Sequence, residues 1–116
     1  MKLRTVLSLG GNRSEHRMHE VVRQVVIRGR VQGVGYRYWT MREAIRLGVG
    51  GWVRNRRDGS VEALFVGPAE AVAEMAVRCR NGPEFARVDG IEDQPGAENA
   101  LKMIRTGERF SQLPTV

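Results

Sequence analysis

Cysteine is almost absent from this sequence of 116 residues, and the single one, Cys79, has no partner for an internal disulfide. A lone thiol fits a reducing compartment, and we expect a cytoplasmic protein. Long apolar runs are also lacking, since none approaches the ~20 residues of a membrane-spanning helix. The apolar patch from Val6 to Leu9 is shorter than the core of a secretory signal, which has about 7–15 residues. We therefore expect neither export nor membrane association.

Acidic residues are scarce in one part of the chain. The net charge is +6, but the stretch from Arg23 to Arg57 holds nine arginines and only one acid, Glu43. Such a concentration of positive charge attracts anions, whether phosphate esters, nucleic acid or an acidic surface. Four of these arginines could steer anionic substrates, but a solvated surface role is at least an equal alternative for them; they are Arg30, Arg54, Arg56 and Arg57.

Glycine, by contrast, is plentiful, and three of the 14 glycines lie in IRGRVQGVGYRYW, residues 27–39. This stretch joins a β-branched run to a helical pattern. Glycines at such a junction let main-chain N–H groups converge on an anion, and the start of the helix adds partial positive charge. Arg37 stands at that start, from which its guanidinium reaches the same anion with two parallel donors.

Neither of the common phosphate motifs matches this loop. A Walker loop has Gly-Lys-Ser/Thr after the turn, whereas Tyr36, Arg37 and Tyr38 follow the last glycine here. The dinucleotide fingerprint needs a third glycine where Tyr38 stands, and a parallel βαβ context as well. The loop therefore predicts an anion site of another kind.

Hydrophobic periodicity and turn residues predict a chain that alternates strands and helices. The predicted strands are 21–28, 51–56, 60–66, 85–92 and a further edge strand 108–113; the predicted helices are 36–47 and one that begins at Pro68 and ends at Asn81-Gly82-Pro83. An Asp58-Gly59 turn joins the two middle strands, and 93–103 is predicted as a loop. The order predicts an α+β, ferredoxin-like βαββαβ sandwich with two helices on one face of an antiparallel sheet. The domain is expected over 21–116, after a flexible extension, 1–20, in which Met18 is an alternative start.

Five motifs of the sequence resemble those of the acylphosphatase family, in the family's order and spacing. They are GRVQGVGYR (29–37), GWVRN (51–55), DGSVE (58–62), GP (67–68) and GPEFARVD (82–89). The resemblance is continuous over 21–92. GERFSQLPTV (107–116) is the candidate for the family's last strand, and residues 1–20 have no counterpart. The resemblance implies a free-standing enzyme that hydrolyses the carboxyl–phosphate anhydride of small acyl phosphates to carboxylate and inorganic phosphate.

The resemblance also implies the site residues. The main-chain amides of Gln32, Gly33, Val34, Gly35, Tyr36 and Arg37 would hold the phosphoryl oxygens, and the Arg37 side chain would grip them. The side-chain amide of Asn55 would hold the attacking water. One of the aromatic residues at positions 36, 38 and 39 is expected to line the acyl side of the pocket. No cofactor is implied, and we expect a monomer whose ligands are the acyl phosphate and phosphate or a similar oxyanion.

The residue types agree with this chemistry. An acyl phosphate is already activated, so charge neutralisation and a placed water suffice and no nucleophile is needed. Cys79 falls on an apolar helical stripe and is expected in the core. His16, His19 and the cysteine lack metal-ligand spacing, and the loop lacks the paired acids of a magnesium site, so we expect metal-free hydrolysis. No general base is evident, and we hypothesise that anionic oxygens of the substrate accept the proton.

Three alternatives remain open from the sequence. The first is a nucleic-acid-binding module, because the same fold carries RNA-recognition domains. Those domains stack bases on aromatic residues of the central strands, whereas SVEALFV (60–66) has only Phe65, so nucleic acid is not expected as a partner. The second is a domain that binds carbamoyl phosphate within a larger maturation enzyme, whose zinc-binding and catalytic domains are not in this sequence. The third is an inactive protein of the same fold, against which the joint presence of Arg37 and Asn55 argues.

Overall fold

The computed structural model describes residues 20–116, and the predicted flexible extension, apart from Glu20, lies outside the described residues. The strands are β1 (Glu20–Arg30), β2 (Gly50–Asn55), β3 (Val61–Pro68), β4 (Arg87–Pro95) and β5 (Ser111–Gln112); the helices are α2 (Tyr36–Leu47), α3 (Ala69–Cys79) and α4 (Glu98–Leu101). Within 20–116, no helix has the length and hydropathy needed to cross a membrane.

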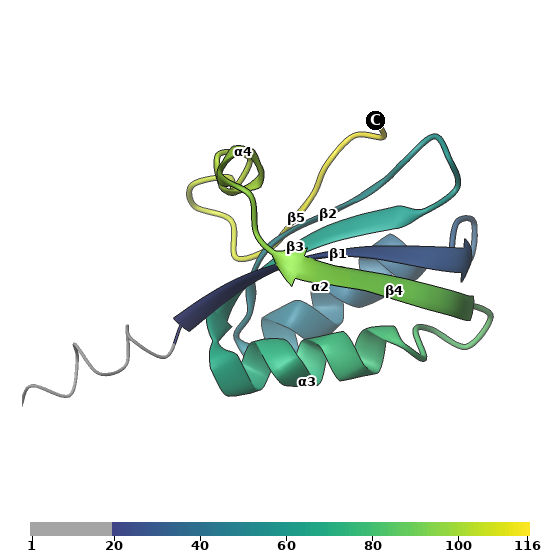
Figure 1. Ribbon diagram of the computed structural model, residues 1–116, viewed down its shortest axis with the longest axis horizontal. Coiled ribbons are helices and arrows are strands. Elements are labelled where there is room, and N and C mark those ends of the chain that lie inside the picture. Colours follow the sequence, from purple (N-terminus) through teal and green to yellow (C-terminus); the bar gives the residue numbers. More distant parts are fainter. Residues whose placement is uncertain (1–19) are drawn as a thin grey trace, which may run out of the picture.

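The strands form one sheet in the order β4-β1-β3-β2-β5. Strand β1 lies between β3 and β4 and pairs antiparallel with both, and β2 pairs antiparallel with β3. Helices α2 and α3 cover the same face of this sheet (Figure 1). The arrangement is the ferredoxin-like βαββαβ sandwich that the sequence predicted, so the fold class is confirmed.

The main core lies between the sheet and these two helices. Successive residues of a strand face opposite sides of a sheet, and Val25 and Ile27 of β1 and Phe65 of β3 are fully buried on the helix side. Val72 and Cys79 of α3 pack against them. The prediction that Cys79 is a core residue is confirmed, and burial raises the pKa of its thiol to about 12. The thiol is therefore neutral and packed, which removes it as a nucleophile.

Helix α2 has the predicted bounds because glycines flank it. Gly35 and Gly48 cap its two ends in the left-handed conformation, with φ values of 81° and 74°, which residues with side chains seldom adopt. Its buried residues are Tyr36, Thr40 and Ala44. The Thr40 hydroxyl donates a hydrogen bond to the main-chain oxygen of Tyr36 at 2.8 Å, and this bond satisfies a polar group within the core.

Two predicted boundaries differ from the structure. Helix α3 begins at Ala69, one residue later than predicted, because Pro68 has extended backbone with ψ at 141° and ends β3. Strand β4 covers Arg87–Pro95 rather than 85–92, because its antiparallel pairing with β1 determines its extent. Phe85 lies outside the strand and is 74% exposed.

The predicted hairpin of β2 and β3 is confirmed, with strand ends that differ by one or two residues from the prediction. Gly59 in its turn has φ at 93°, as an Asp-Gly turn requires. The Asp58 carboxylate accepts hydrogen bonds from the Ser60 hydroxyl at 2.6 Å and the Ser60 main-chain N–H at 2.9 Å. These bonds lower the pKa of Asp58 to about 2, so the carboxylate that holds the turn is charged at neutral pH.

The predicted loop over 93–103 is wrong, because this segment contains the end of β4 and the helix α4. Helix α4 lies on the face of the sheet opposite α2 and α3 (Figure 1), where a second, smaller core contains Trp52, Leu64 and Ala100. The Trp52 indole N–H donates to the main-chain oxygen of Ala100 at 2.8 Å. A helix of four residues is too short to leave a periodic pattern in the sequence, which explains the error.

The predicted edge strand forms, but it is shorter than 108–113. Strand β5 pairs in parallel with β2 at Trp52 and Val53. Beyond it, the main-chain N–H of Val116 donates to the main-chain oxygen of Asn55 at 3.2 Å. The C-terminal segment therefore follows β2 as far as the end that carries Asn55.

Candidate active site

The glycine-rich segment forms a loop between the end of β1 and the start of α2. Gly33 and Gly35 have φ values of 75° and 81°, and a Cβ at either position would meet no atom within 4 Å. Glycine is thus required here by the backbone conformation and not by crowding. Within residues 20–116, the main-chain N–H groups of Gly33, Val34 and Gly35 have no hydrogen-bond acceptor.

The first turn of α2 adds further main-chain donors, since the first four N–H groups of a helix have no partner inside it. The first main-chain bond of this helix joins the N–H of Trp39 to the oxygen of Gly35 at 3.0 Å. The N–H groups of residues 36–38 therefore remain beside those of the loop. Together they form a concave set of amide donors at a helix N-terminus, an arrangement that suits an oxyanion.

This set of donors lines a cavity of about 140 Å³. Six of the predicted site residues line it, namely Gln32, Gly33, Gly35, Tyr36, Arg37 and Asn55. The remaining one, Val34, is half-buried and packs against the main core. The structure thus brings the loop of one βα unit next to the end of β2, which sequence spacing alone does not show.

Asn55 reaches the cavity because it is the last residue of β2 and faces the same side as Val53, whose side chain is in the main core. Its neighbours Arg54 and Arg56 face the other side of the sheet. The Asn55 Oδ1 atom is buried and accepts no hydrogen bond from any described residue. Buried polar atoms nearly always have partners, so this oxygen is suited to accept a hydrogen bond from a water in the cavity.

The Gln32 side chain has a role that the sequence did not predict. Its Nε2 atom donates to the main-chain oxygens of Arg56 and Ser60, both at 2.8 Å. These two bonds join the loop to the β2–β3 hairpin on either side of its turn. They hold the amide donors at a fixed position relative to Asn55.

Gln112 of β5 and Tyr38 of α2 also line the cavity and were not predicted as phosphate-binding residues. Gln112 lies at the cavity because β5, near the C-terminus, pairs with β2. Its Nε2 atom lies 3.7 Å from the Met41 sulfur. The ring of Tyr38 is exposed, and the expectation that an aromatic residue lines the acyl side of the pocket stays a prediction.

Tyr36 contributes its main chain to the cavity, while its hydroxyl is engaged elsewhere. The hydroxyl donates to the main-chain oxygen of Cys79 at 2.6 Å. Burial of the ring, with a smaller effect of Cys79, raises the pKa of Tyr36 above its ordinary value. The phenol is therefore neutral, and it joins α2 to the end of α3.

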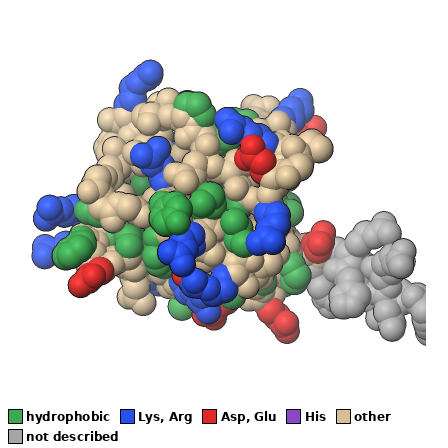
Figure 2. Space-filling model, turned by 180° about the vertical axis from the view of Figure 1, so that it is seen from behind, with side chains coloured by type: hydrophobic (Ala, Val, Ile, Leu, Met, Phe, Trp, Pro, Cys, Tyr) green, Lys and Arg blue, Asp and Glu red, His purple; other side chains and the backbone are tan. Residues whose placement is uncertain are grey.

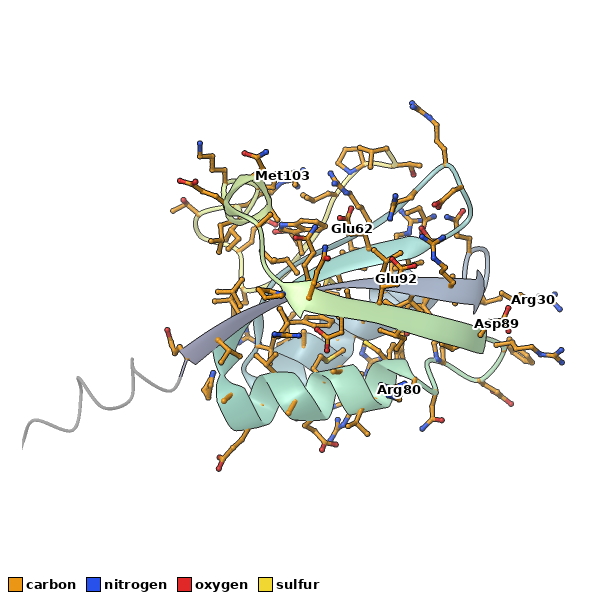
Figure 3. The ribbon with its side chains drawn as sticks, in the orientation of Figure 1. Arg30, Glu62, Arg80, Asp89, Glu92 and Met103 are labelled. Carbon is orange, nitrogen blue, oxygen red and sulfur yellow. The ribbon has the colours of Figure 1, made fainter. Side chains whose placement is uncertain are left out.

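Two arginines of the basic stretch differ in how their charge is compensated. Within residues 20–116, no carboxylate lies within 4.0 Å of the half-buried Arg37. Arg54, by contrast, pairs with Glu62 at 2.8 Å and lies 4.8 Å from the centre of the Trp52 ring. Glu62 and Met103, which both contact Arg54, are on the α4 side of the sheet (Figure 3). Arg54 is thus a packed structural residue, and Arg37 has a charge available for an anion.

Groups that could bind a metal are dispersed. Within residues 20–116, no three His, Cys, Asp or Glu side chains lie close enough together to hold a metal ion. His16 and His19 lie outside the described residues. The titratable side chains that line the cavity are those of Arg37 and the two tyrosines.

The chain also matches known proteins over most of its length. The family model described as acylphosphatase covers residues 23–106. The chain belongs to the acylphosphatase family. An acylphosphatase of Nitrobacter winogradskyi is 87% identical over 99 residues, which are 85% of this chain and 100% of that protein. An acylphosphatase of Bradyrhizobium diazoefficiens is 54% identical over the same shares of both chains.

Solved structures agree with this family assignment. The crystal structure of acylphosphatase from Bacillus subtilis superposes with a TM-score of 0.69 at 34% identity, covering 80% of this chain and 98% of that one. The HypF protein of T. kodakarensis matches with a TM-score of 0.63 at 25% identity, but the match covers 82% of this chain and only 12% of HypF. The resemblance inferred from the five motifs is therefore confirmed at the level of family and fold.

Proposed function

We propose that this chain hydrolyses small acyl phosphates to a carboxylate and inorganic phosphate, with the Gln32–Arg37 loop holding the phosphoryl group and Asn55 placing the water. Membership of the acylphosphatase family supports the hydrolase activity itself. The observation that carries the residue roles is the cavity of about 140 Å³ that the loop, Arg37 and Asn55 line together.

The proposed reaction transfers the phosphoryl group to water. The water oxygen attacks phosphorus, the bond between phosphorus and the acyl oxygen breaks, and the electron pair of that bond leaves with the carboxylate. Main-chain N–H groups of the loop and the Arg37 guanidinium stabilise charge on the phosphoryl oxygens that remain. A carboxylate is a good leaving group, so the reaction needs no general acid.

The proton of the water has few acceptors among the side chains of the cavity. Arg37 is permanently charged, the Tyr36 phenol is held by Cys79, and an asparagine amide takes no proton at neutral pH. We therefore propose that a phosphoryl oxygen accepts the proton, which yields dihydrogen phosphate and carboxylate. Asn55 then acts by position, through a hydrogen bond between the water and its buried Oδ1 atom.

Hydrolysis of benzoyl phosphate in the presence of EDTA, for the wild type and for Asn55→Ala, tests this function. We expect rapid release of benzoate and phosphate without added metal, and a fall in kcat of about 10²-fold in the variant. Inhibition by inorganic phosphate should be unchanged in Asn55→Ala, because the loop still holds the anion. An Asn55→Ala protein as fast as the wild type would refute the water-placing role, and loss of activity on chelation alone would refute metal-free hydrolysis.

The observations do not favour the alternative functions. Phe65, the one aromatic residue of β3, is fully buried on the helix side, and Trp52 is fully buried under α4. The described sheet therefore has no exposed aromatic ring on which a base could stack. The relatives from Nitrobacter winogradskyi and Bacillus subtilis match over 98–100% of their own length, whereas HypF matches over 12%. The match to HypF is thus confined to a small part of that protein.

A further inference from the structure

A second cavity adjoins the candidate active site and has not been given a role. It has a volume of about 320 Å³ and shares Gly35 and Tyr38 with the phosphate cavity. Trp39, Arg42, Glu43 and Arg46 of α2 line it further along the helix, and Pro83 completes the lining. Positions 35, 38, 39, 42 and 46 recur at helical spacing, so the cavity follows one face of α2 away from the loop.

Arg42 is the cationic group of this cavity whose charge is not compensated. The carboxylate of Glu43 is engaged by Arg46 at 2.5 Å and by Arg78 at 2.7 Å. No carboxylate within residues 20–116 pairs with Arg42. Its guanidinium instead lies 5.7 Å from the centre of the exposed Tyr38 ring, a distance typical of a cation–π contact. The side of the molecule on which α2 lies shows Lys and Arg side chains beside exposed hydrophobic ones (Figure 2).

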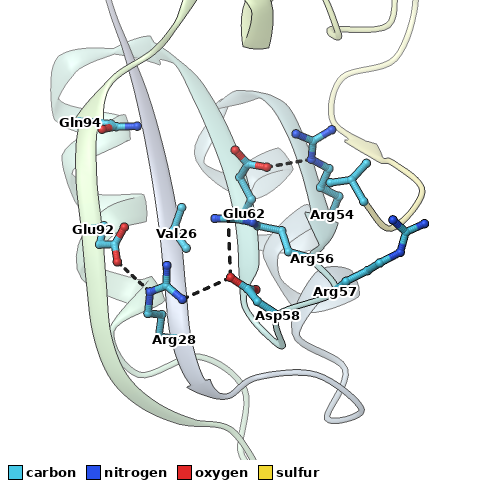
Figure 4. A pocket seen from close by; sticks show the side chains of 10 residues that line it. Val26, Arg28, Arg54, Arg56, Arg57, Asp58, Glu62, Glu92 and Gln94 are labelled. Atoms are coloured by element: carbon cyan, nitrogen blue, oxygen red, sulfur yellow. Dashed lines mark hydrogen bonds and ion pairs between the residues drawn. The ribbon is translucent and has the colours of Figure 1, made fainter.

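A third cavity, larger than these two, is different in kind. It has a volume of about 570 Å³ and lies on the opposite face of the sheet, where Arg28, Arg54 and Arg56 contribute to its lining (Figure 4). Three of its four arginines are paired: Arg28 contacts Glu92 at 2.7 Å, Arg54 contacts Glu62 at 2.8 Å, and Arg56 lies 3.8 Å from Asp58. The fourth, the exposed Arg57, has no carboxylate within 4.0 Å among residues 20–116. The carboxylates of Asp58, Glu62 and Glu92 all line this cavity and would repel an incoming anion. The cavity beside Tyr38 is lined by one carboxylate, that of Glu43, which is engaged by Arg46 and Arg78 and not by Arg42.

The size of the two adjoining cavities indicates how a substrate divides between them. About 140 Å³ is well below the ~300 Å³ at which ordinary ligand sites begin. The phosphoryl group therefore occupies most of the first cavity, and the acyl group extends out of it. Arg42 follows Arg37 by five residues, which is about 7.5 Å along the helix axis at ~1.5 Å per residue. A four-carbon acyl chain spans a distance of this order.

We infer that the Tyr38–Arg42 cavity is the acyl-group subsite, and that Arg42 favours acyl phosphates whose acyl chain ends in a carboxylate. This inference rests on the proposed function, because it assumes that the loop holds the phosphoryl group. The planar guanidinium offers two parallel donors to a terminal carboxylate, and the Tyr38 ring holds it beside the entrance. The positive charge of Arg42, which no described carboxylate pairs with, would be neutralised by the terminal carboxylate of the acyl chain.

Two acyl phosphates that differ only at the far end of the chain provide the test. Butanoyl phosphate ends in a methyl group, and succinyl phosphate carries a carboxylate in its place. We expect the wild type to have a higher kcat/KM for succinyl phosphate than for butanoyl phosphate. In Arg42→Gln the ratio of these two kcat/KM values should fall roughly 3- to 10-fold, as expected for the loss of an exposed, bidentate ion pair. The fall should appear mainly in KM, and Arg42→Lys should restore part of it.

Arg80→Gln is the matched control, because it removes the same charge from an exposed arginine near the end of α3 and outside the cavity (Figure 3). The control should keep the wild-type ratio. An unchanged ratio in Arg42→Gln, or an equal fall in Arg80→Gln, would overturn the subsite. Hydrolysis of neither substrate by the wild type would overturn the proposed function, and the subsite with it.

Discussion

Two arginines of this protein, Arg54 of β2 and Arg37 of α2, differ in whether their charge is paired with a carboxylate. Arg54 is paired with Glu62 and packs on Trp52, so its charge is used inside the molecule. Arg37 lies half-buried at the start of α2, beside the loop amides, and has no carboxylate partner within residues 20–116. A cation placed in this way attracts an anion, because its desolvation has not been offset by any protein group.

Replacing Arg37 tests this use of its charge. Arg37→Ala should lower kcat/KM for benzoyl phosphate by roughly 10³-fold, because Arg37 is the one cationic residue among positions 20–116 that lines the cavity. Arg37→Lys should recover less than about 10-fold of this loss, because one ammonium group cannot reproduce the planar pair of donors. Steady-state kinetics and inhibition by phosphate measure both effects.

The expected control is Arg87→Ala, an exposed arginine of β4 outside the cavity. It should change kcat/KM by less than about 2-fold, which would separate binding by Arg37 from general attraction of anions. In contrast to Asn55→Ala, Arg37→Ala should weaken inhibition by phosphate. Equal inhibition of the wild type and Arg37→Ala would contradict the phosphate-holding role of Arg37.

At the scale of elements, the candidate site combines a loop and the end of a strand that are far apart in the sequence. The glycine-rich loop follows β1, and Asn55 is the last residue of β2, so neither segment alone contains the site. The Gln32 side chain connects them through two hydrogen bonds to the β2–β3 hairpin. The turn of that hairpin is in turn held by Asp58 and Ser60. If Asn55 places the water as proposed, its position relative to the loop depends on the hairpin as well.

Removing this connection should lower both the stability of the protein and its kcat. Gln32→Ala leaves two main-chain oxygens without their donor, and a loss of roughly 1–3 kcal/mol in the free energy of unfolding is expected. Because the loop is then free to shift relative to Asn55, kcat should fall by roughly 10-fold or more. Urea unfolding and benzoyl phosphate kinetics on the same samples give the two numbers.

Gln24→Ala provides the comparison for that experiment. Gln24 is on β1, and its side chain donates to Glu62 at 2.7 Å and accepts from the Ala97 main-chain N–H at 3.1 Å, on the other face of the sheet. The Gln24→Ala variant should lose a similar free energy of unfolding to Gln32→Ala and keep the wild-type kcat. If Gln24→Ala and Gln32→Ala lose kcat equally, the connection between loop and hairpin has no special role.

At the scale of the whole molecule, each face of the sheet has a separate cover. Helices α2 and α3 cover one face over the main core, and α4 with the C-terminal segment covers part of the other. The described residues that line the candidate site lie between Val31 and Gln112, within the same sheet and its covering helices. The monomeric state, the cytoplasmic location and the extent of the N-terminal extension stay predictions.

The N-terminal prediction is open to a direct test. Deletion of residues 1–17 should leave kcat and KM for benzoyl phosphate within about 2-fold of the full chain, because the candidate site draws its residues from positions 31–112. Kinetics of the shortened and full chains, together with light scattering for the oligomeric state, measure the effect. A large loss of activity would mean that the extension contributes to the folded domain, and a stable dimer would contradict the expected monomer.

The sequence by itself determined the features that depend on local conformation. Left-handed glycines at 33, 35 and 48 set the loop and both ends of α2, the Asp58-Gly59 turn set the hairpin, and alternating apolar residues set the helix-covered core. The five motifs led to Arg37 and Asn55 through the family resemblance. Only the tertiary structure decided which groups meet. It brings the Gln32 side chain to the hairpin and Gln112 to the cavity. It also buries Trp52 under α4 and leaves Arg42 without a carboxylate partner among residues 20–116. Backbone torsions are encoded within a few residues, whereas these contacts arise from strand pairing between segments far apart in the chain.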